Sequence, residues 1–349
     1  MNRAAPLPQR LFEHLASDGP APAARAFQSG EQLAQALGVS RSAVWKAAAQ
    51  LRALGLAIDA LPRQGYRLHR AAGLLDVASI RARLAPDTVA RLRNGECLWS
   101  TGSTNADLLA RNAPARGAFD FLAAEYQLAG RGRRGRRWLA PPGGGLCLSW
   151  SWSFDALPAQ SGALSLAVGV SALRALRRLG IAGVGLKWPN DLVTTGGKLG
   201  GILIELKSEA GGPLHVVVGI GLNVALGDAI TRDVAATGNR AVDLASLGVA
   251  PDRNALIAAL LESGVQGLAT FAQSGFASFG DDYRDADVLA GQRVVVAGTR
   301  DSATGTVLSG TALGIDADGA LLVQTPGGVE RVLSGDVSVR AGGLADEQP

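Results

Sequence analysis

The alternation of hydrophobic and polar positions begins with a helical pattern. Residues 7–17 carry apolar side chains at helical spacing, and residues 30–55 read as two further helices separated by a turn at Gly38. Ser40 is suited to cap the second of these helices. Residues 56–70 then alternate as a two-stranded hairpin. The pattern predicts a helix-turn-helix followed by a wing.

The pattern changes in the middle of the chain, where helices and strands mix. Strands are expected at residues 97–100, 119–127, 146–154, 183–195, 198–209 and 215–226. Helices are expected at residues 103–112, 165–180 and 254–271. The last three strands follow one another without a helix between them, which favours an α+β layer over repeated βαβ units.

The C-terminal pattern consists of short strands separated by Gly/Asp turns. Residues 291–340 show this spacing, and Ala317-Asp318-Gly319 has the chemistry of a tight hairpin turn. The pattern predicts a small β-barrel. We therefore expect a multidomain α+β protein with domains at residues 1–72, 76–288 and 289–341, and a hinge near residues 71–79.

The charge is concentrated in the N-terminal domain. The chain has a net charge of +4, whereas residues 1–75 alone hold nine Arg/Lys and four Asp/Glu. A basic module on a nearly neutral body suits an anionic partner such as nucleic acid. Candidate DNA contacts are Arg41, Ser42 and Lys46 on the second helix, with Arg63 and Arg67 on the wing. Trp45 is expected in the core. The alternative is a small packing module whose basic face is only solvated.

The composition argues against several other classes of protein. The two cysteines, Cys97 and Cys147, lie in apolar strand-like runs and imply neither a disulfide framework nor a metal site. The N-terminus lacks the apolar stretch of a signal peptide, and no uncharged apolar run is long enough to span a membrane. We expect a soluble, cytoplasmic protein without membrane contact.

Residues 130–138, GRGRRGRRW, form the most unusual stretch, which we call the Arg–Gly loop. Its G-x-G-x-x-G spacing mimics a dinucleotide site, but Pro141 and Pro142 prevent the helix that such a site needs. A nucleic-acid patch is the alternative for any arginine run. Because apolar strands flank the loop on both sides, a loop that closes over a phosphate-bearing ligand fits better.

Four further polar clusters lie at the ends of predicted elements. They are STN (103–105), KWPND (187–191), GGKLGG (196–201) and GIGLNV (219–224). Each alone is most often a solvated turn, but Asn223 within an apolar strand is costly to bury unless it is paired. Four such clusters together predict one ligand site at the same end of the sheet as the Arg–Gly loop.

These motifs, in this order, resemble those of the biotin–protein ligases. The winged helix ahead of them resembles the bifunctional form of that family, which also represses the biotin operon, and the resemblance covers roughly residues 8–341. It implies a central mixed sheet like that of class II synthetases and an SH3-like C-terminal barrel. The Arg–Gly loop and KWPND together are specific to the family, whereas a winged helix alone is not.

The resemblance also implies roles for individual residues. The biotin site would comprise Ser103, Thr104, Asn105, Gln127, Gly130, Arg131, Gly132, Arg133, Lys198, Gly200 and Gly201. The ATP site would comprise Arg136, Trp138, Lys187, Asn190, Asp191 and Asn223, with Asp191 and Asn223 also supporting Mg²⁺. Lys198, Arg131 and Arg133 would be the catalytic residues, with Lys198 contacting the biotin carboxylate and the α-phosphate.

The family's chemistry would proceed in two steps. The biotin carboxylate attacks the α-phosphorus of ATP and releases pyrophosphate, and a lysine of the biotin carboxyl carrier protein of acetyl-CoA carboxylase then attacks the biotinyl-AMP. Biotinyl-AMP would also order the Arg–Gly loop and favour a homodimer that binds operator DNA. Two alternatives stay open: a biotin-sensing transcription factor without ligase activity, and a lipoate-type acyl-protein ligase.

Overall fold

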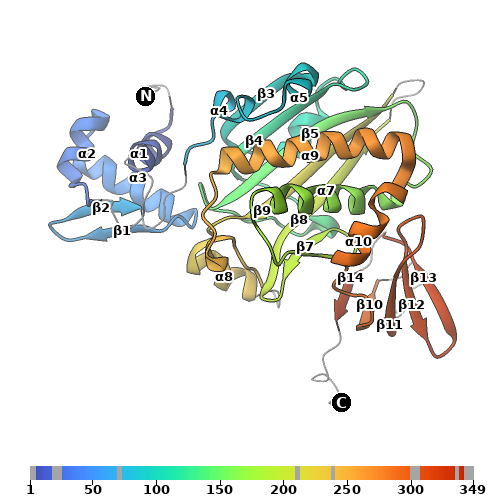
Figure 1. Cartoon of the computed structure of the whole chain (residues 1–349). Coiled ribbons are helices and arrows are strands. Elements are labelled where there is room, and N and C mark those ends of the chain that lie inside the picture. The colour runs from blue at the N-terminus through green and yellow to red at the C-terminus, as the bar shows by residue number, and fades with distance from the viewer. Residues whose placement is uncertain are drawn as a thin grey trace, which may run out of the picture.

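The computed structural model describes residues 5–17, 26–68, 73–208, 213–236, 240–298, 307–334 and 338–341. Three regions follow one another in space as they do in the sequence (Figure 1): helices with a hairpin, a large sheet covered by helices, and a small sheet near the C-terminus. This arrangement confirms the predicted fold class.

The N-terminal region is a winged helix-turn-helix, as predicted. Its elements are α1 (Leu7–Ser17), α2 (Gly30–Leu37), α3 (Arg41–Ala53), β1 (Ile58–Leu61) and β2 (Gly65–Leu68). Ser29 and Gln32 form a capping box at the start of α2, and Gly38 ends that helix with a left-handed φ of 66°. The Ser40 hydroxyl accepts from the Ala43 amide at 3.2 Å and starts α3.

The winged helix buries a hydrophobic core of its own. Its largest members are Leu11, Phe12, Leu15, Leu33, Leu37, Val44, Leu51, Ile58 and Leu68. The prediction that Trp45 joins this core is wrong, because its side chain is 60% exposed. Successive residues of a helix are rotated by about 100°. Since α3 buries Val44, Ala48 and Leu51, the neighbouring Trp45 points outward.

The central region is built on a seven-stranded mixed sheet in the order β3-β4-β5-β9-β8-β7-β6. The strands are β3 (Leu92–Thr101), β4 (Phe119–Gln127), β5 (Gly145–Phe154), β6 (Gly185–Lys187), β7 (Asp191–Thr194), β8 (Gly197–Lys207) and β9 (Leu214–Asn223). β3 and β4 are parallel, and all other neighbours are antiparallel. The strand predicted at residues 183–195 is therefore two strands, separated by a turn at Pro189, which cannot donate to a sheet.

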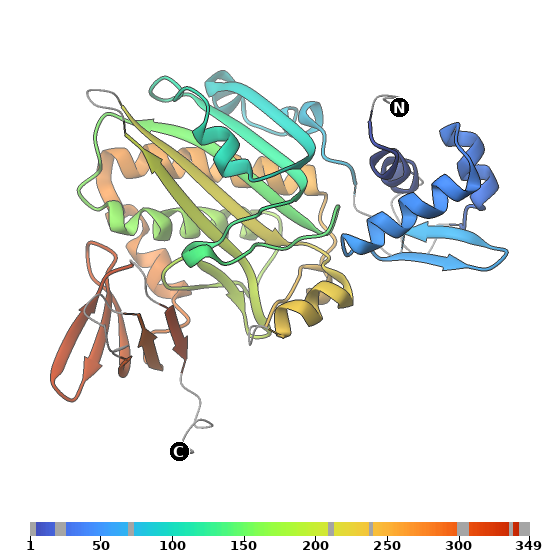
Figure 2. The ribbon, with the colours of Figure 1, turned by 180° about the vertical axis from the view of Figure 1, so that it is seen from behind.

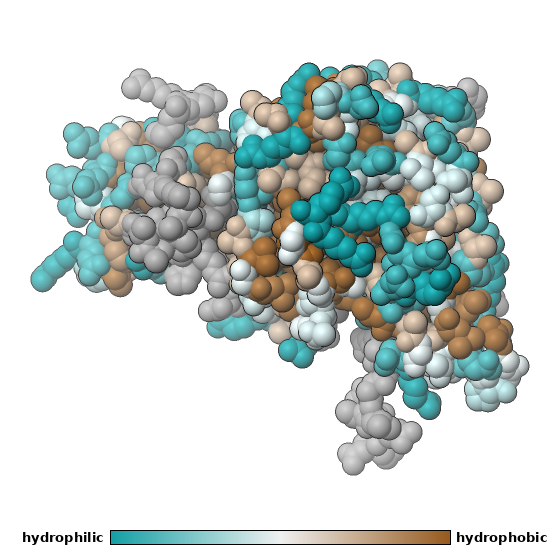
Figure 3. Space-filling model, in the orientation of Figure 1, coloured by the Kyte–Doolittle hydropathy of each residue, from teal (hydrophilic) through white to brown (hydrophobic). Residues whose placement is uncertain are grey.

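Helices cover the two faces of this sheet unequally. α7 (Leu164–Arg178) and α9 (Arg253–Ser274) pack together on one face (Figure 1). Hydrophilic side chains gather on the outer surface of this face (Figure 3). The opposite face carries the short helix α6 (Thr104–Leu109), and the chain around the Arg–Gly loop crosses it (Figure 2). The face with two long helices holds the main core, so the α6 face remains open to a ligand.

Four further short helices were not predicted: α4 (Val77–Arg81), α5 (Pro86–Arg91), α8 (Gly227–Ala235) and α10 (Gly280–Ala286). Five to nine residues are too few for a helical hydrophobic period to stand out. α4 also occupies the end of the predicted hinge at residues 71–79, of which 71 and 72 lie outside the described residues. The hinge prediction is therefore wrong from Val77 onward.

The segment from Arg253 to Ala286, which begins with α9, is long and apolar enough to cross a membrane by length and composition. This is weak evidence, because 61% of its most apolar window is buried inside the protein. Leu256, Leu260 and Val265 of α9 belong to the central core, and α9 packs on α7. The helix is accounted for as the core helix of this fold.

The C-terminal region is a five-stranded antiparallel sheet in the order β13-β12-β11-β10-β14. Its strands are β10 (Arg293–Ala297), β11 (Val307–Ile315), β12 (Leu321–Thr325), β13 (Gly328–Val332) and β14 (Ser338–Ala341). Among the described residues no pairing joins β13 to β14 to close a barrel. Val294, Val296 and Leu321 are buried in the same hydrophobic cluster as the central region.

Candidate active site

Three glycines make a flat patch on the α6 face of the sheet, and we call this patch the glycine floor. Its members are Gly201 on β8 with Gly219 and Gly221 on β9. A Cβ atom at Gly219 would lie 2.3 Å from Asn105 Oδ1, and one at Gly221 would lie 2.4 Å from Trp138 Cε2. A Cβ at Gly201 would lie 3.2 Å from Lys198 Nζ. Three candidate side chains therefore lie directly on bare backbone.

A buried hydrogen-bond network joins the start of α6 to the sheet. Ser103 caps the helix, and Gln127 Oε1 accepts from the Thr104 amide at 2.8 Å. The Thr104 hydroxyl lies 2.7 Å from Ser149 Oγ, and Ser149 donates to Asn105 Oδ1 at 2.6 Å. Buried polar groups need such partners. The network fixes the two side chains of the STN motif that face the sheet.

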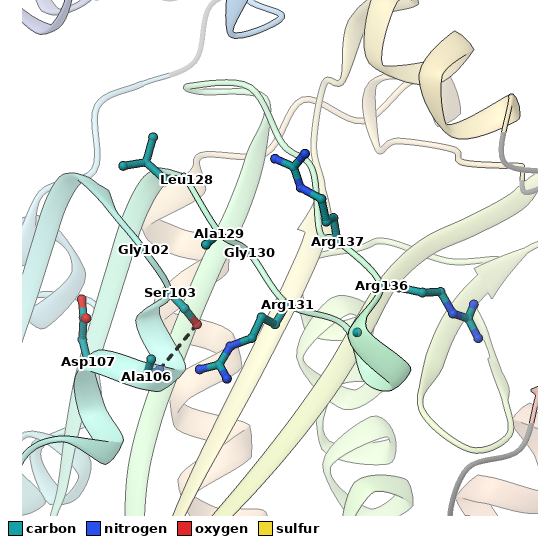
Figure 4. A pocket seen from close by; sticks show the side chains of 11 residues that line it. Gly102, Ser103, Ala106, Asp107, Leu128, Ala129, Gly130, Arg131, Arg136 and Arg137 are labelled. Atoms are coloured by element: carbon teal, nitrogen blue, oxygen red, sulfur yellow. Dashed lines mark hydrogen bonds between the residues drawn. The ribbon is translucent and has the colours of Figure 1, made fainter.

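The Arg–Gly loop folds back on itself beside α6. Gly132 donates from its amide to Arg136 O at 2.7 Å, and Trp138 donates to Gly130 O at 2.9 Å. The loop borders a cavity of about 500 Å³ that also reaches Ser103. In Figure 4 the side chain of Arg131 points toward α6, whereas Arg136 and Arg137 point away from it.

Charged and amide groups gather at the end of the floor where β7 meets β8. Lys198 Nζ lies 2.5 Å from Asp191 Oδ1, and Asn223 Nδ2 donates to Lys198 O at 3.2 Å and to Val242 O at 2.9 Å. Asn190 donates to Ile202 O at 2.7 Å, which anchors the KWPND turn to β8. The structure thus brings Lys198, Asp191 and Asn223 together.

Two of the predicted site residues point elsewhere. Arg133 lies in the 3-10 turn Arg133–Gly135 and donates to the Ser334 carbonyl of the C-terminal region, not toward the floor. A Cβ at Gly200 would meet Leu192 and Leu222, so this residue faces the core and could offer a ligand only its backbone. Alternation along β8 explains the second case, because neighbouring residues face opposite sides of a sheet.

Sequence reasoning missed two residues of this site. Ser149 is fully buried between Thr104 and Asn105. Glu205 Oε2 accepts from Asn105 Nδ2 at 2.8 Å, and Glu205 Oε1 lies 3.4 Å from Arg131 Nη1. A signal existed for both: Ser149 is a serine facing away from the tryptophans of residues 146–154, and Glu205 interrupts an apolar strand.

A buried ion pair supports the chain behind the Arg–Gly loop. Glu125 and Arg253 are 2.7 Å apart, with side-chain exposures of 6% and 2%. Glu125 accepts from the Gly143 amide at 3.2 Å, and Arg253 donates to Gly145 O at 3.4 Å and to Gly73 O at 2.5 Å. The pair joins the linker after the winged helix to the turn before β5. No sequence spacing indicates it.

The two cysteines are unsuited to nucleophilic chemistry. Burial raises the pKa of the Cys97 thiol and of the Cys147 thiol to about 12, and the nearby Glu125 carboxylate adds to both shifts. A thiol with such a pKa is protonated at neutral pH. Any reaction at this site must therefore proceed without a cysteine thiolate.

The possible metal ligands at the end of the glycine floor near Lys198 can hold a cation only together with the phosphate groups of a substrate. Within the described ranges no three His, Cys, Asp or Glu side chains come together as metal ligands. Asp191 supplies one carboxylate, which pairs with Lys198 Nζ, and Asn223 Nδ2 donates to the backbone carbonyl of Lys198. Mg²⁺ commonly uses one or two carboxylates together with substrate phosphates. These residues fit that pattern.

Four of the five candidate DNA-binding residues of the winged helix are exposed to solvent. Arg41, Ser42, Lys46 and Arg63 are all exposed. Arg67 is instead engaged within the module, because it pairs with Asp59 at 2.8 Å and lies over the Phe27 ring. The exposed Trp45 shares the outward side of α3 with Lys46.

Three family models match the chain. The biotin/lipoate A/B protein ligase family matches residues 101–223, an HTH domain matches residues 23–67, and the biotin protein ligase C terminal domain matches residues 291–340. The bifunctional ligase/repressor BirA of Salmonella typhimurium is 36% identical over 90% of this chain and 94% of its own length. The chain belongs to the biotin–protein ligase family.

Other relatives agree with this assignment. The biotin–[acetyl-CoA-carboxylase] ligase of Mycobacterium tuberculosis is 37% identical over 70% of this chain and 88% of its own length. The biotin protein ligase of Aquifex aeolicus, solved with biotin and ATP, aligns with a TM-score of 0.60 at 28% identity, covering 72% of this chain and all of that one. The predicted resemblance to the family is confirmed.

Proposed function

We propose that the chain makes biotinyl-AMP from biotin and ATP on the glycine floor. The observation that carries this proposal is the convergence of Asn105, Trp138 and Lys198 on three glycines, with Asp191 and Asn223 beside Lys198. The floor lets flat ligand groups approach backbone closely. Amides and hydroxyls at one end suit the ureido ring of biotin, and the cation at the other end suits phosphate.

In the first step the biotin carboxylate attacks the α-phosphorus of ATP, and pyrophosphate leaves. Two anions must approach each other, so the main task of the protein is to neutralise and orient charge. Lys198 serves the carboxylate and the α-phosphate, Arg136 and Lys187 serve the ATP phosphates, and Trp138 packs near the adenine. Mg²⁺, held at Asp191 and Asn223, would lower the charge of the phosphates.

In the second step a lysine amine of the carrier protein attacks the carbonyl of the mixed anhydride, and AMP leaves. The anhydride must meanwhile be shielded from water, which is the proposed task of the Arg–Gly loop and of Arg131 in particular. The acceptor is the biotin carboxyl carrier protein of acetyl-CoA carboxylase. The reaction takes place in the cytoplasm, and the two free cysteines are consistent with a reducing compartment.

The winged helix adds a second function, repression at a two-fold operator. Its exposed Arg41, Ser42, Lys46 and Arg63 supply phosphate and base contacts. A homodimer that forms with biotinyl-AMP presents two such modules to the DNA. In this proposal the chain comprises three domains: the winged helix at residues 1–72, the catalytic domain at residues 76–288 and the C-terminal domain at residues 289–341.

Biotin-dependent ATP–pyrophosphate exchange, followed by labelling of an added carrier domain, tests the ligase. We expect exchange with biotin and none with lipoate. Lys198→Ala should nearly abolish exchange, whereas Lys207→Ala, an exposed lysine at the far end of the same strand, should retain it. Absence of exchange with Mg²⁺ present would favour a biotin sensor, and exchange with lipoate would favour the lipoate-type enzyme.

A further inference from the structure

Glu205 puts a negative charge at a site that is proposed to bind anions. Alternation along β8 places Gly201, Leu203 and Glu205 on the same face of the sheet, so Glu205 lies on the ligand side of the strand. Its side chain is 24% exposed. A partly buried carboxylate next to anionic substrates opposes their binding unless it acts on another charged group.

The contacts of Glu205 identify that group as Arg131. One carboxylate oxygen accepts from Asn105 Nδ2 at 2.8 Å, and the other lies 3.4 Å from Arg131 Nη1. Asn105 is itself fixed by Ser149, which donates to its Oδ1, and by Leu203 O, which accepts from its Nδ2. Glu205 therefore extends from a rigid base to the Arg–Gly loop.

Asn105 alone does not require a carboxylate at this position. An amide oxygen would accept its hydrogen bond as well, and the remaining contacts of Asn105 keep its side chain in place. Among the described residues, the charged partner of the Glu205 carboxylate is the guanidinium of Arg131, whose side chain is 48% exposed. In Figure 4 that guanidinium points toward α6 at the edge of the cavity.

We infer that Glu205 is a positioning residue for the adenylation reaction: it orients Arg131 of the Arg–Gly loop over the biotin site. This inference rests on the proposed function, because it assumes that Arg131 acts on bound biotin. Glu205 does not touch the reacting atoms. It limits the orientations of Arg131, so that less conformational entropy is lost when the ligand binds.

A double-mutant cycle with Glu205→Gln and Arg131→Gln tests this inference. Glu205→Gln retains the acceptor for Asn105 and loses the charge. We expect kcat/KM for biotin in the exchange assay to fall about two- to fivefold, as for a partly exposed ion pair. The change should be in the KM for biotin, with the KM for ATP unchanged. In the Arg131→Gln background, Glu205→Gln should cause no further loss.

Two controls make the outcome decisive. Glu96→Gln removes an ion pair of comparable exposure, to Arg111 at 2.8 Å and away from the site, and should leave the kinetics unchanged. Thermal unfolding of every variant checks that the fold is retained. An equal or larger loss in the Arg131→Gln background, or no loss in the wild-type background, overturns the role of Glu205. If the wild-type protein shows no biotin-dependent exchange, the proposed function fails first.

Discussion

The two terminal regions of this chain both read as separate modules in the sequence, yet they are attached in different ways. The winged helix has its own hydrophobic core, against which Trp99 of the central region packs. Phe12 lies 5.3 Å from Trp99, ring centre to ring centre, and Trp99 lies against Tyr126. Gly55, after α3, comes close to Ile230 and Pro141.

The C-terminal sheet shares the central core instead of having its own. Its buried valines and leucines belong to the same cluster as α7 and α9. Polar contacts add to this: Trp188 Nε1 donates to Gly319 O at 2.9 Å, and Gln160 donates to Ala317 O at 2.8 Å. Arg133 of the Arg–Gly loop also donates to Ser334. A domain boundary inferred from the sequence pattern therefore does not reveal whether the regions before and after it fold independently.

The largest expected difference comes from deleting each region. A chain of residues 73–349 should stay folded and retain biotin-dependent exchange, because it loses only a neighbour with a separate core. A chain of residues 1–288 should lose both cooperative unfolding and exchange, because its core would be open to water. Circular dichroism melting and the exchange assay measure the two outcomes. A stable, active 1–288 chain would contradict the shared core.

The linker after the winged helix is held by the buried ion pair of Arg253 and Glu125. Breaking this pair is expected to have the next largest effect on stability. Arg253→Met leaves Glu125 buried without its partner and should cost about 3–5 kcal/mol of unfolding free energy. Arg83→Met is the control, because it removes an exposed ion pair to Asp252 and should cost at most about 1 kcal/mol. Urea unfolding measures both. Similar costs for the two variants would mean that the buried pair contributes little.

The docking of the C-terminal sheet can be weakened at one turn. Gly319 has φ +81°, and an added Cβ would lie 2.7 Å from Ala163 Cα. Gly291 has φ +75° with nothing within 4 Å of such a Cβ. Gly291→Ala should show only the backbone strain, about 1–2 kcal/mol. Gly319→Ala should lower the free energy of unfolding by about 1–3 kcal/mol more than Gly291→Ala, because its Cβ overpacks against Ala163. Thermal melting measures both variants. Equal shifts of the melting temperature would refute tight docking at this turn.

The smallest effect is expected where the winged helix meets the central sheet. Trp99→Leu should loosen the contact with Phe12 by about 0.5–1.5 kcal/mol and leave biotin-dependent exchange unchanged. Calorimetry of the winged-helix transition measures this change. Trp45→Leu, at a side chain that is 60% exposed, should alter stability by about 0.5 kcal/mol or less. A larger loss of stability in Trp45→Leu than in Trp99→Leu would mean that the stabilising contact is made by α3 and not by Trp99.

The sequence predicts those elements whose pattern is set by local chemistry. The helix at 7–17 and the strand at 119–127 are found at the expected residues, because each has a long, clear hydrophobic period. The helix α8 is too short to show a hydrophobic period, so the sequence does not predict it. Trp45 is 60% exposed because of its position on the helix, which the size of its side chain does not reveal.

The candidate site was predicted through its motifs, and its supporting contacts were not. Lys198 and Asp191 could be grouped from adjoining motifs of the chain. Ser149, Glu205 and Arg253 make their contacts only through the sheet register and packing, and the contacting residues are up to 180 positions apart in the chain. Such contacts depend on the assembled fold and leave little trace in any one stretch.

The glycine floor also limits how the ligand site could be redesigned. Gly201, Gly219 and Gly221 have no side chain to shorten, so the site is already as deep on this side as a polypeptide allows. A variant that accepts a bulkier analogue of the ligand must gain room from the side chains that stand on the floor or from the loop above it. Libraries aimed at new substrates should therefore vary the walls and leave the floor unchanged.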